Sequence, residues 1–314
     1  MAKKANPPTS AKSAQPAPPS PPQRSVLARL RPWVLVVGAG VGLAGYGVQR
    51  LQNLLPDLSS REEYQAGLAQ IEITPPPRWV PQNFIEQVLH AANLPEKFSL
   101  LDDHLAHDIA EAFQLHPWVE RVVSVHTSIP AAVRVHLEYR RPAAMIQVAQ
   151  GMYPIDAQGV LLPPADFSVS DARLYPRVVN VRSTPQGPAG TGWGDPIVAG
   201  AARLAEALAP HWKKWQLAAI VCPQEAPSED SLDQGLYVLT STGGSRILWG
   251  LPPDAKHPGE LTTEQKLGKL KKYVDDFGSF DRPRGPYEIN IRHWQEIGRQ
   301  TLTTELETLE IQRQ

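Results

Sequence analysis

The residues whose types and spacing could support chemistry begin with a histidine pair. His104 and His107 are three positions apart, and Asp103 and Asp108 flank them. Two histidines at i and i+3 on a helix can bind one metal ion, but a closed zinc site needs three or four converging ligands. His116 is the nearest further candidate. We therefore expect a solvated helix face here rather than a metal site.

Other candidate groups fit structural roles. The sequence contains no nucleophile elbow, no HExxH motif and no P-loop. No strand leads directly into the glycine-rich run 191–194, as a phosphate loop requires, so we expect a surface loop there. Glu225, Glu229 and Asp230 lie in a Pro/Ser-rich stretch and are expected to be solvated rather than a catalytic pair. We therefore expect no enzymatic activity and no cofactor.

Composition narrows the class of protein. The 31 basic and 32 acidic residues give a formal net charge of −1, which does not indicate nucleic-acid binding. Cys222 is the single cysteine, so no intrachain disulfide can form, and it is expected to be buried beside Val221. The 32 prolines indicate many loops, and 314 residues allow two or three domains.

The N-terminal part predicts a tail followed by a membrane helix. Residues 1–31 contain six Lys or Arg and no acid, so we expect a disordered basic tail that is either inert or a docking arm. Residues 32–49 carry no charge, and at about 1.5 Å per residue they reach roughly 27 Å, close to a bilayer core. We expect an uncleaved transmembrane anchor there rather than a signal peptide, with the N-terminus in the cytoplasm. Residues 50–67 would be a linker.

Four residues define how this anchor would sit in a membrane. Trp33 and Tyr46 lie where interfacial aromatic residues belong. Gly38 and Gly42 form a GxxxG pair that would permit close helix contact, although we interpret the segment as a plain anchor. Five glycines, at 38, 40, 42, 45 and 47, lower its hydropathy.

Residues 116–163 hold the clearest pattern. From 133 to 140 the side chains alternate as in a strand with one buried face: Val133, Val135, Leu137 and Tyr139 face one way, and Arg134, His136, Glu138 and Arg140 face the other. The valine-rich run 119–125 predicts a neighbouring strand, and residues 127–130 a turn. His126 and His136 are expected on the polar face, and Trp118 in the core.

Periodicity predicts further elements on both sides of this strand pair. Upstream we expect a strand at 69–74 and helices starting after Val80 and near Asp102, which gives the order strand, helix, helix, strand, strand over 68–140. Downstream, residues 141–298 are mostly β, with strands expected at 144–148, 153–155, 160–162, 177–181, 217–222, 235–240, 245–249 and 287–294. A helix is expected at 196–209, and another after the capping box of Thr262 and Gln265. Residues 242–244 predict a hairpin turn. The fold class is therefore α+β, with a tail at 299–314.

These motifs together resemble the FtsQ/DivIB bacterial cell-division proteins. The resemblance covers residues 24 to about 297 and starts from His-Pro-Trp-Val at 116–119 and the alternating strand. The residues at the family's junction between domains are Arg141, Pro142 and Ala143, with Asp156 and Gly159 in the following hairpin. Trp249-Gly250 and Lys266-Leu267 match the later part of the family, where Asn290 and His293 replace an acid and an aromatic residue. Three prolines stand where the family has a glycine after its first strand.

The resemblance implies a POTRA domain at 68–140 and a β domain at 141–298. It implies a non-catalytic scaffold that links early division proteins to late septal peptidoglycan synthesis, with FtsB- and FtsL-type coiled-coil proteins as partners and the POTRA domain aiding recruitment. It also implies an inner-membrane protein with periplasmic C-terminal domains. Alternatives are another POTRA-bearing envelope protein, which would need a following β-barrel repeat, and a membrane-held cell-wall enzyme, which would need a convergent catalytic set.

The last clear strand, 287–294, is expected to be an exposed edge that binds a partner strand. The resemblance points to the same place, because the last strands of the family's β domain receive the FtsB-type partner. The candidate binding residues are Tyr287, Ile289, Ile291, Arg292, His293 and Trp294. The alternative is that residues 301–309 pair with this edge and close it.

Overall fold

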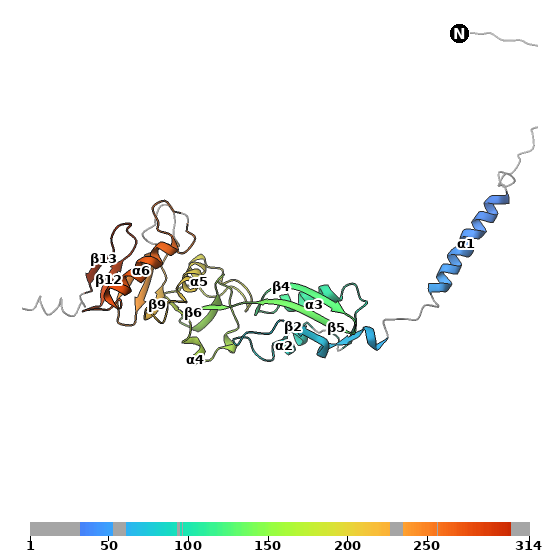
Figure 1. Ribbon diagram of the computed structural model, residues 1–314, viewed down its shortest axis with the longest axis horizontal. Helices are drawn as coiled ribbons and strands as arrows, with labels where there is room; N and C mark the ends of the chain where they lie inside the picture. Colours follow the sequence, from blue (N-terminus) through green and yellow to red (C-terminus); the bar gives the residue numbers. More distant parts are fainter. Residues whose placement is uncertain are drawn as a thin grey trace, which may run out of the picture. The chain divides into compact units, whose positions relative to one another are not determined.

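A computed structural model describes residues 32–52, 61–92, 95, 97–226, 235–255 and 257–302. The chain divides into two compact units, residues 1–58 and residues 59–314. Helix α1 (Pro32–Gln52) is the described part of the first unit (Figure 1). The expected disordered tail at 1–31, residues 303–309 of the alternative edge-closing segment, and Glu229 and Asp230 all lie outside the described residues.

The prediction of a transmembrane helix at residues 32–49 is wrong. Helix α1 forms, with 21 residues, but none of the described helices has the length and apolar character that a membrane crossing demands. Length is sufficient, at about 1.5 Å per residue, so the deficit lies in composition: five glycines occupy positions that larger apolar side chains would need to fill. Among the described residues, no atom lies within 4 Å of a Cβ built at Gly38 or Gly42. Tyr46 is exposed, and its hydroxyl accepts a hydrogen bond from Arg50 Nε at 3.3 Å.

The first part of the second unit is built around a three-stranded sheet. Its elements are η3 (Glu62–Tyr64), β1 (Gln65–Gly67), η4 (Leu68–Gln70), β2 (Ile71–Ile73), α2 (Phe84–Ala91), β3 (Lys97–Ser99), α3 (Leu105–Gln114), β4 (Val119–Ser128) and β5 (Ala132–Tyr139). The sheet order is β2-β5-β4, with β2 parallel and β4 antiparallel to β5. The expected order of strand, two helices and two strands is present, and a small β1–β3 sheet is added to it.

The alternating strand is correctly predicted. Val133, Val135 and Leu137 are buried in β5, while Arg134, His136 and Glu138 are exposed. Helices α2 and α3 supply the other side of this core with side chains at helical spacing, among them Phe84, Val88, Ile109 and Phe113. Trp118 is fully buried in the same cluster, as expected.

The second part is an eight-stranded mixed sheet. Its elements are β6 (Pro142–Val148), β7 (Gly151–Asp156), η5 (Pro164–Asp166), α4 (Val169–Ala172), β8 (Arg177–Val179), α5 (Pro196–Leu208), β9 (Leu217–Val221), β10 (Tyr237–Ser241), β11 (Arg246–Gly250), α6 (Thr263–Phe277), β12 (Tyr287–Asn290) and β13 (Gly298–Thr301). The order across the sheet is β13-β12-β11-β10-β9-β8-β6-β7. The α+β class is therefore confirmed for this unit.

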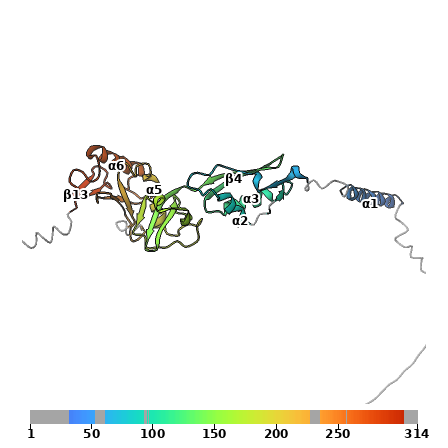
Figure 2. The same cartoon turned by 90° about the horizontal axis from the view of Figure 1, so that it is seen from below.

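Two crossovers explain why α5 and α6 share one face of this sheet (Figures 1 and 2). Helix α5 connects the parallel pair β8 and β9, and α6 connects the parallel pair β11 and β12. Both crossovers step toward β13 from strands that run the same way, and such connections are right-handed. Side chains of both helices consequently enter one hydrophobic cluster with Trp249, Ile247 and Ile289.

Local signals in this part were correctly predicted. Thr262 and Gln265 make both hydrogen bonds of the capping box, with Gln265 N donating to Thr262 Oγ1 at 3.3 Å. The turn at 242–244 joins β10 to β11, and Gly244 adopts a φ of 89° there. Asp281 closes this turn: it accepts from Ser241 Oγ at 2.6 Å and from the amides of Gly243 and Ser245 at 3.2 Å each.

Three local expectations need correction. Residues 160–162 form no strand, because Val160 and Leu161 make only isolated bridges, to Gly192 and to Ile155. The run 191–194 is a loop, but Trp193 is buried and donates from Nε1 to Ser183 Oγ at 3.0 Å. The spacing of apolar residues predicts that Leu267, Leu270, Val274 and Phe277 form the buried stripe of α6. The buried residues are instead Lys266, Leu270 and Tyr273, and Phe277 is exposed.

Candidate protein-binding site

The outer strand at one end of the large sheet is β13. It pairs antiparallel with β12, with Thr301 opposite Tyr287, Gln300 opposite Glu288, Arg299 opposite Ile289 and Gly298 opposite Asn290. All four residues of β13 are exposed. Within the described ranges no strand pairs with its other side. An unpaired strand edge presents N–H and C=O groups that a further strand can bind.

The register determines which backbone groups of β13 face that open side. The amide of Leu302 donates to Pro286 O at 2.9 Å, so 302 and 286 form a hydrogen-bonded pair. In an antiparallel ladder such pairs alternate with non-bonded ones. Gln300 therefore faces β12, while the N–H and C=O groups of Arg299 and Thr301 point to the open side.

The side chain of Arg299 holds β13 against the sheet and α6. Its guanidinium carbon lies 4.5 Å from the ring centroid of Phe277 and 5.0 Å from that of Tyr287. Such cation–π contacts contribute about 0.5–2 kcal/mol each, depending on exposure. A strand of four polar residues is thereby fixed at the sheet edge although it buries no side chain of its own.

A pocket of about 630 Å³ opens between α6 and the chain around β13. Its lining is Lys269, Lys272, Tyr273, Asp276, Phe277, Gln295, Ile297 and Arg299. Smaller pockets on the same surface involve His293 and Trp294 on one side and Glu288 and Gln300 on the other. A strand added to β13 would therefore have hollows beside it for its side chains, which is how strand addition gains sequence preference.

The expected edge strand is displaced by one strand. Strand β12 ends at Asn290 and is paired on both sides, with β11 and with β13, so residues 287–294 are not the edge. Tyr287, Ile289 and Ile291 are buried in the core and cannot contact a partner directly. The closing strand is 298–301, earlier than the alternative segment at 301–309. The short polar run Gly-Arg-Gln-Thr has no apolar alternation, so no strand signal marked it.

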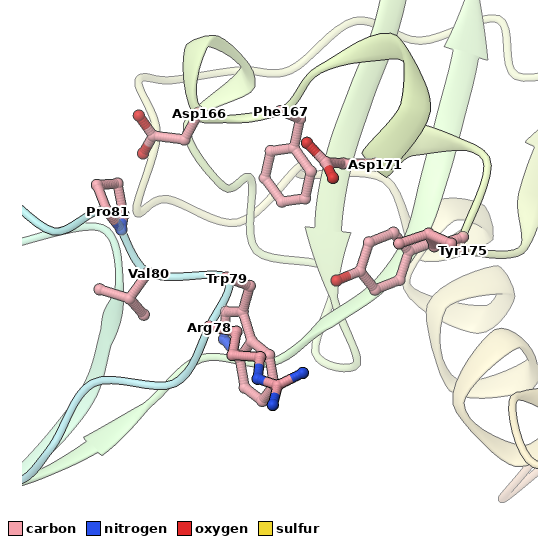
Figure 3. Close-up of a pocket in the computed structure, with 9 residues that line it drawn as sticks. Arg78, Trp79, Val80, Pro81, Asp166, Phe167, Asp171 and Tyr175 are labelled. Carbon is pink, nitrogen blue, oxygen red and sulfur yellow. The ribbon is translucent and has the colours of Figure 1, made fainter.

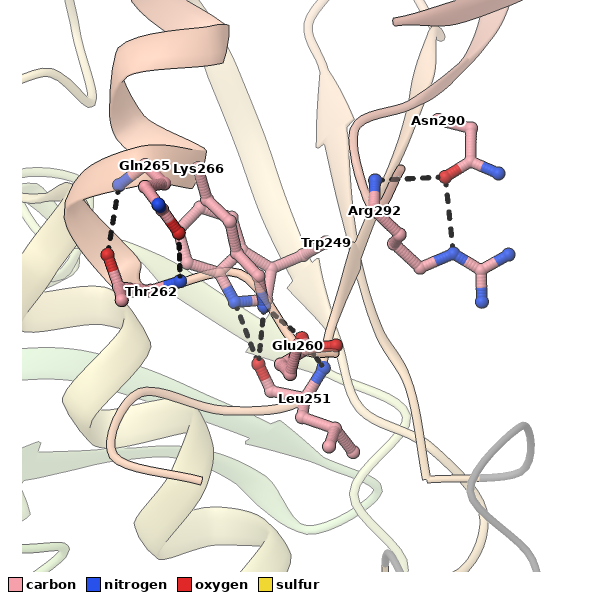
Figure 4. Close-up of polar contacts among 8 residues, drawn as sticks. All are labelled: Trp249, Leu251, Glu260, Thr262, Gln265, Lys266, Asn290 and Arg292. Carbon is pink, nitrogen blue, oxygen red and sulfur yellow. Dashed lines mark hydrogen bonds and ion pairs between the residues drawn. The ribbon is translucent and has the colours of Figure 1, made fainter. Parts of the chain in front are cut away.

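The remaining candidate residues lie in the turn from β12 to β13. Trp294 is 63% exposed, and His293 is also exposed. Arg292 donates from its amide and from Nε to Asn290 Oδ1, at 3.1 and 3.2 Å (Figure 4). The His293 ring lies 3.2 Å from Asn290 Nδ2. Lys269 Nζ donates to the His293 carbonyl. Trp294 is thus presented by a turn that Asn290 and Lys269 hold in place.

A buried ion pair anchors α6 behind this surface (Figure 4). The side chain of Lys266 is 2% exposed; it pairs with Glu260, donates to Leu251 O at 3.1 Å and lies 5.0 Å from the ring centroid of Trp249. Glu260 Oε1 also accepts from the Leu251 amide at 3.0 Å. A Cβ at Gly250 would lie 2.8 Å from Glu260 Oε1, and Gly250 has a φ of 98°. Glycine is required there because the carboxylate occupies the space a side chain would need.

Near the predicted junction, the arginine that forms a buried ion pair is Arg140 rather than Arg141. Arg140 Nη1 pairs with Asp156 Oδ2 at 2.8 Å, and this carboxylate is buried. Asp156 Oδ1 also accepts from the amides of Gln158 and Val160, at 3.0 and 2.8 Å. Arg141 is exposed, while Pro142 and Ala143 are buried at the start of β6. The hairpin residues thus fix the chain where the two parts meet.

The histidines show no shared ligand geometry. His104, His107, Asp103 and Asp108 are exposed around α3, as expected for a solvated helix face. His116 packs edge-on against Phe84 and contacts Gln87 Oε1 at 3.2 Å; burial lowers its pKa, against an opposing effect of Asp166. His126 and His136 are exposed, with ring centroids 6.1 Å apart. Among the residues that the structure describes, no group of three His, Cys, Asp or Glu side chains could hold a metal ion.

Cys222 is buried, as expected, and burial raises its thiol pKa to about 12.

The described part of the second unit is an α+β fold whose large sheet ends in the exposed outer strand β13. No known family model matches the chain, and no curated protein matches it. The likeness to the FtsQ/DivIB proteins therefore rests on the quoted motifs and stays a prediction.

Proposed function

We propose that residues 61–302 act as a non-catalytic scaffold of the bacterial division machinery, linking early division proteins to late septal peptidoglycan synthesis. The open edge at β13 is the observation that carries this proposal, because it offers backbone groups and neighbouring pockets to an extended partner. In this proposal the folded part works in the periplasm, where septal peptidoglycan is made.

The motif residues support the proposal through the contacts they make. Lys266, Gly250 and Trp249 form one buried arrangement with Glu260 behind the candidate surface. Asp156 and the neighbouring Arg140 form a second, at the point where the two parts of the unit meet. Residues that carry the resemblance thus form buried charged contacts at two places, around Lys266 and around Asp156.

The partner in this proposal is a coiled-coil division protein of the FtsB or FtsL type. An extended segment of it adds to β13 as a ninth strand, bonded to the backbone of Arg299 and Thr301. Trp294 and the pocket beside Phe277 contact its side chains. The three-stranded part, with α2 and α3, serves recruitment to the septum.

Thr301→Pro is expected to weaken partner binding about tenfold or more, because proline removes an outward N–H and one backbone hydrogen bond contributes roughly 0.5–1.5 kcal/mol, with a further cost for the group left unpaired. The N–H of Thr301 does not face β12, so the β12–β13 ladder keeps its bonds. The measurement is capture of the FtsB-type protein of the same organism by the purified full-length chain, as a function of concentration.

Thr301→Ala is the matched control, since it removes the same side chain but keeps the amide. Its binding is expected to equal that of the unchanged chain. If Thr301→Pro and Thr301→Ala bind equally well, the partner does not use this edge. Failure of the unchanged chain to capture any division protein would contradict the scaffold role itself.

A further inference from the structure

A second hollow lies within the second unit, where the chain before α2 meets the chain around α4 (Figure 3). It has a volume of about 370 Å³, which is within the usual range for ligand pockets. Its lining is Arg78, Trp79, Val80, Pro81, Asp166, Phe167, Asp171, Leu174 and Tyr175. We call it the aromatic groove, because the rings of Trp79, Phe167 and Tyr175 line it.

The three rings of the aromatic groove are held in place by contacts with their surroundings. Trp79 Nε1 donates to Arg140 O at 3.0 Å. Phe167 stacks on the buried Trp118 with ring centroids 5.8 Å apart, and Tyr175 meets Phe167 edge-on at 6.1 Å. Figure 3 shows the Tyr175 hydroxyl directed toward Trp79. Because the rings are ordered before a ligand arrives, binding costs less conformational entropy.

Two carboxylates give the aromatic groove its negative charge. Asp166 Oδ2 accepts from Trp118 Nε1 at 2.7 Å, and Asp171 Oδ2 accepts from the Ser168 amide at 3.0 Å. Both acids are exposed, and hydrogen bonds from Ser168 lower the pKa of Asp171, so it is ionised at neutral pH. Among the residues that the structure describes, neither carboxylate pairs with a Lys or Arg. A cationic ligand would supply the missing counter-charge.

Arg78, the basic residue of the lining, does not fill this role. Its side chain is exposed and lies beside Trp79, apart from both carboxylates, in the view of Figure 3. Within the described ranges it forms no ion pair. The end of the groove at Asp166 and Asp171 is therefore acidic, while the other end carries a separate positive charge.

Apolar side chains continue the groove onto the surface. Leu174, in the lining, is 55% exposed, and Val169 in α4 is 75% exposed. Large apolar side chains that cluster beside a hollow mark a binding surface more often than scattered ones do. An occupant with apolar residues beside its cation would cover them.

The combination of rings and carboxylates selects arginine among cationic side chains. A guanidinium is planar, stacks on aromatic rings and pairs with carboxylates through two parallel hydrogen bonds, whereas an ammonium is a compact and strongly hydrated point charge. A cation over an aromatic ring is also attracted by the negative face of the ring. Both kinds of contact are available to one arginine in the aromatic groove.

We propose that the aromatic groove binds an arginine side chain from an extended segment of another protein, with the guanidinium between the rings and the carboxylates of Asp166 and Asp171. Apolar residues next to that arginine cover Leu174 and Val169. This binding is independent of the edge at β13 and of the scaffold role.

The test is a ¹⁹F NMR titration of the purified full-length chain, with 5-fluorotryptophan at its eight tryptophans. The probe is the peptide acetyl-Gly-Leu-Arg-Leu-Gly-amide, and the matched control peptide has citrulline, which is uncharged and of similar shape, in place of arginine. The Trp79 resonance, assigned from a Trp79→Phe variant, is expected to shift with the arginine peptide. The citrulline peptide is expected to bind about tenfold more weakly, the factor for roughly 1.4 kcal/mol. The Trp294 resonance is expected to stay in place, because Trp294 lies in the turn before β13.

Substitution of the two carboxylates tests the charge of the groove. Asp166→Asn with Asp171→Asn is expected to weaken binding of the arginine peptide about tenfold, because the amides still accept hydrogen bonds but carry no charge. Asp103→Asn with Asp108→Asn is the matched control, since it removes two exposed carboxylates outside the groove, and it leaves binding unchanged.

Arg78→Glu provides a second variant that does not depend on the folding of the first. It changes an exposed side chain and adds a negative charge to the lining, so it is expected to tighten binding of the arginine peptide severalfold. The proposal is overturned if the Trp79 resonance does not move, if the two peptides bind equally, or if Arg78→Glu leaves binding unchanged. A Trp79 resonance that shifts with protein concentration in the absence of peptide would show a second copy in the groove, which also overturns it.

Discussion

Val135→Asp is expected to unfold the three-stranded part of the second unit, at a cost of about 4 kcal/mol or more. Val135 is 0% exposed in the central strand β5, opposite Ile73 on one side and Val125 on the other. A carboxylate there would be buried without a partner. The measurement is urea unfolding of the purified chain, together with amide exchange in β4 and β5.

His136→Asp provides the control for this substitution. It introduces the same charge one position along the same strand, on the exposed face. Its expected effect is within about 0.5 kcal/mol, as for most surface changes. Equal stability of the two variants would mean that the inward and outward faces of β5 are wrongly assigned.

Glu260→Gln is expected to destabilise the large sheet by about 3 kcal/mol, because it leaves the Lys266 ammonium buried without its counter-charge. The Glu260 side chain is 16% exposed and that of Lys266 is 2% exposed, so water cannot replace the lost partner. Thermal unfolding of the purified variant measures the effect. Lys266→Met combined with Glu260→Gln removes both charges and should be more stable than Glu260→Gln alone. If the double variant is less stable than Glu260→Gln alone, loss of the counter-charge of Lys266 does not explain the destabilisation.

The same pair predicts how stability depends on pH. Burial lowers the pKa of Lys266 below its usual value, with Glu260 acting in the opposite direction. A base whose pKa is lower in the folded state than in the unfolded state binds fewer protons when folded, so stability rises with pH between the two values. Glu260→Gln removes the opposing effect and widens this window. The variant should therefore recover stability relative to the unchanged chain as the pH rises toward 10.5, the unfolded value.

Patterns within a few residues predicted most of the folded elements. The period of two in β5, the helical spacing of Phe84 and Val88, and the capping box at Thr262 each reflect an interaction between near neighbours in the chain. Such signals do not depend on what the element later packs against. These local signals predicted the helices and most of the strands close to their observed positions.

Features that depend on distant partners were missed or misplaced. Strand β13 exists because Arg299 reaches Phe277 and Tyr287, contacts that no pattern in Gly-Arg-Gln-Thr reveals. The β1–β3 pair joins residues about thirty positions apart and only three residues long on each side. The membrane assignment failed for another reason: absence of charge over 32–49 was given more weight than the glycines that dilute its apolar surface. Because strand β13 was not predicted, the open edge of the sheet was placed one strand too early, at β12.

The most direct test of the scaffold proposal is amide hydrogen exchange in β13 with and without the bound FtsB-type division protein. The amides of Arg299 and Thr301 point to the open side and are predicted to exchange quickly in the free chain and slowly in the complex. The Gln300 amide faces β12 and is predicted to be protected in both. A complex in which Arg299 and Thr301 exchange as quickly as in the free chain would contradict strand addition at this edge.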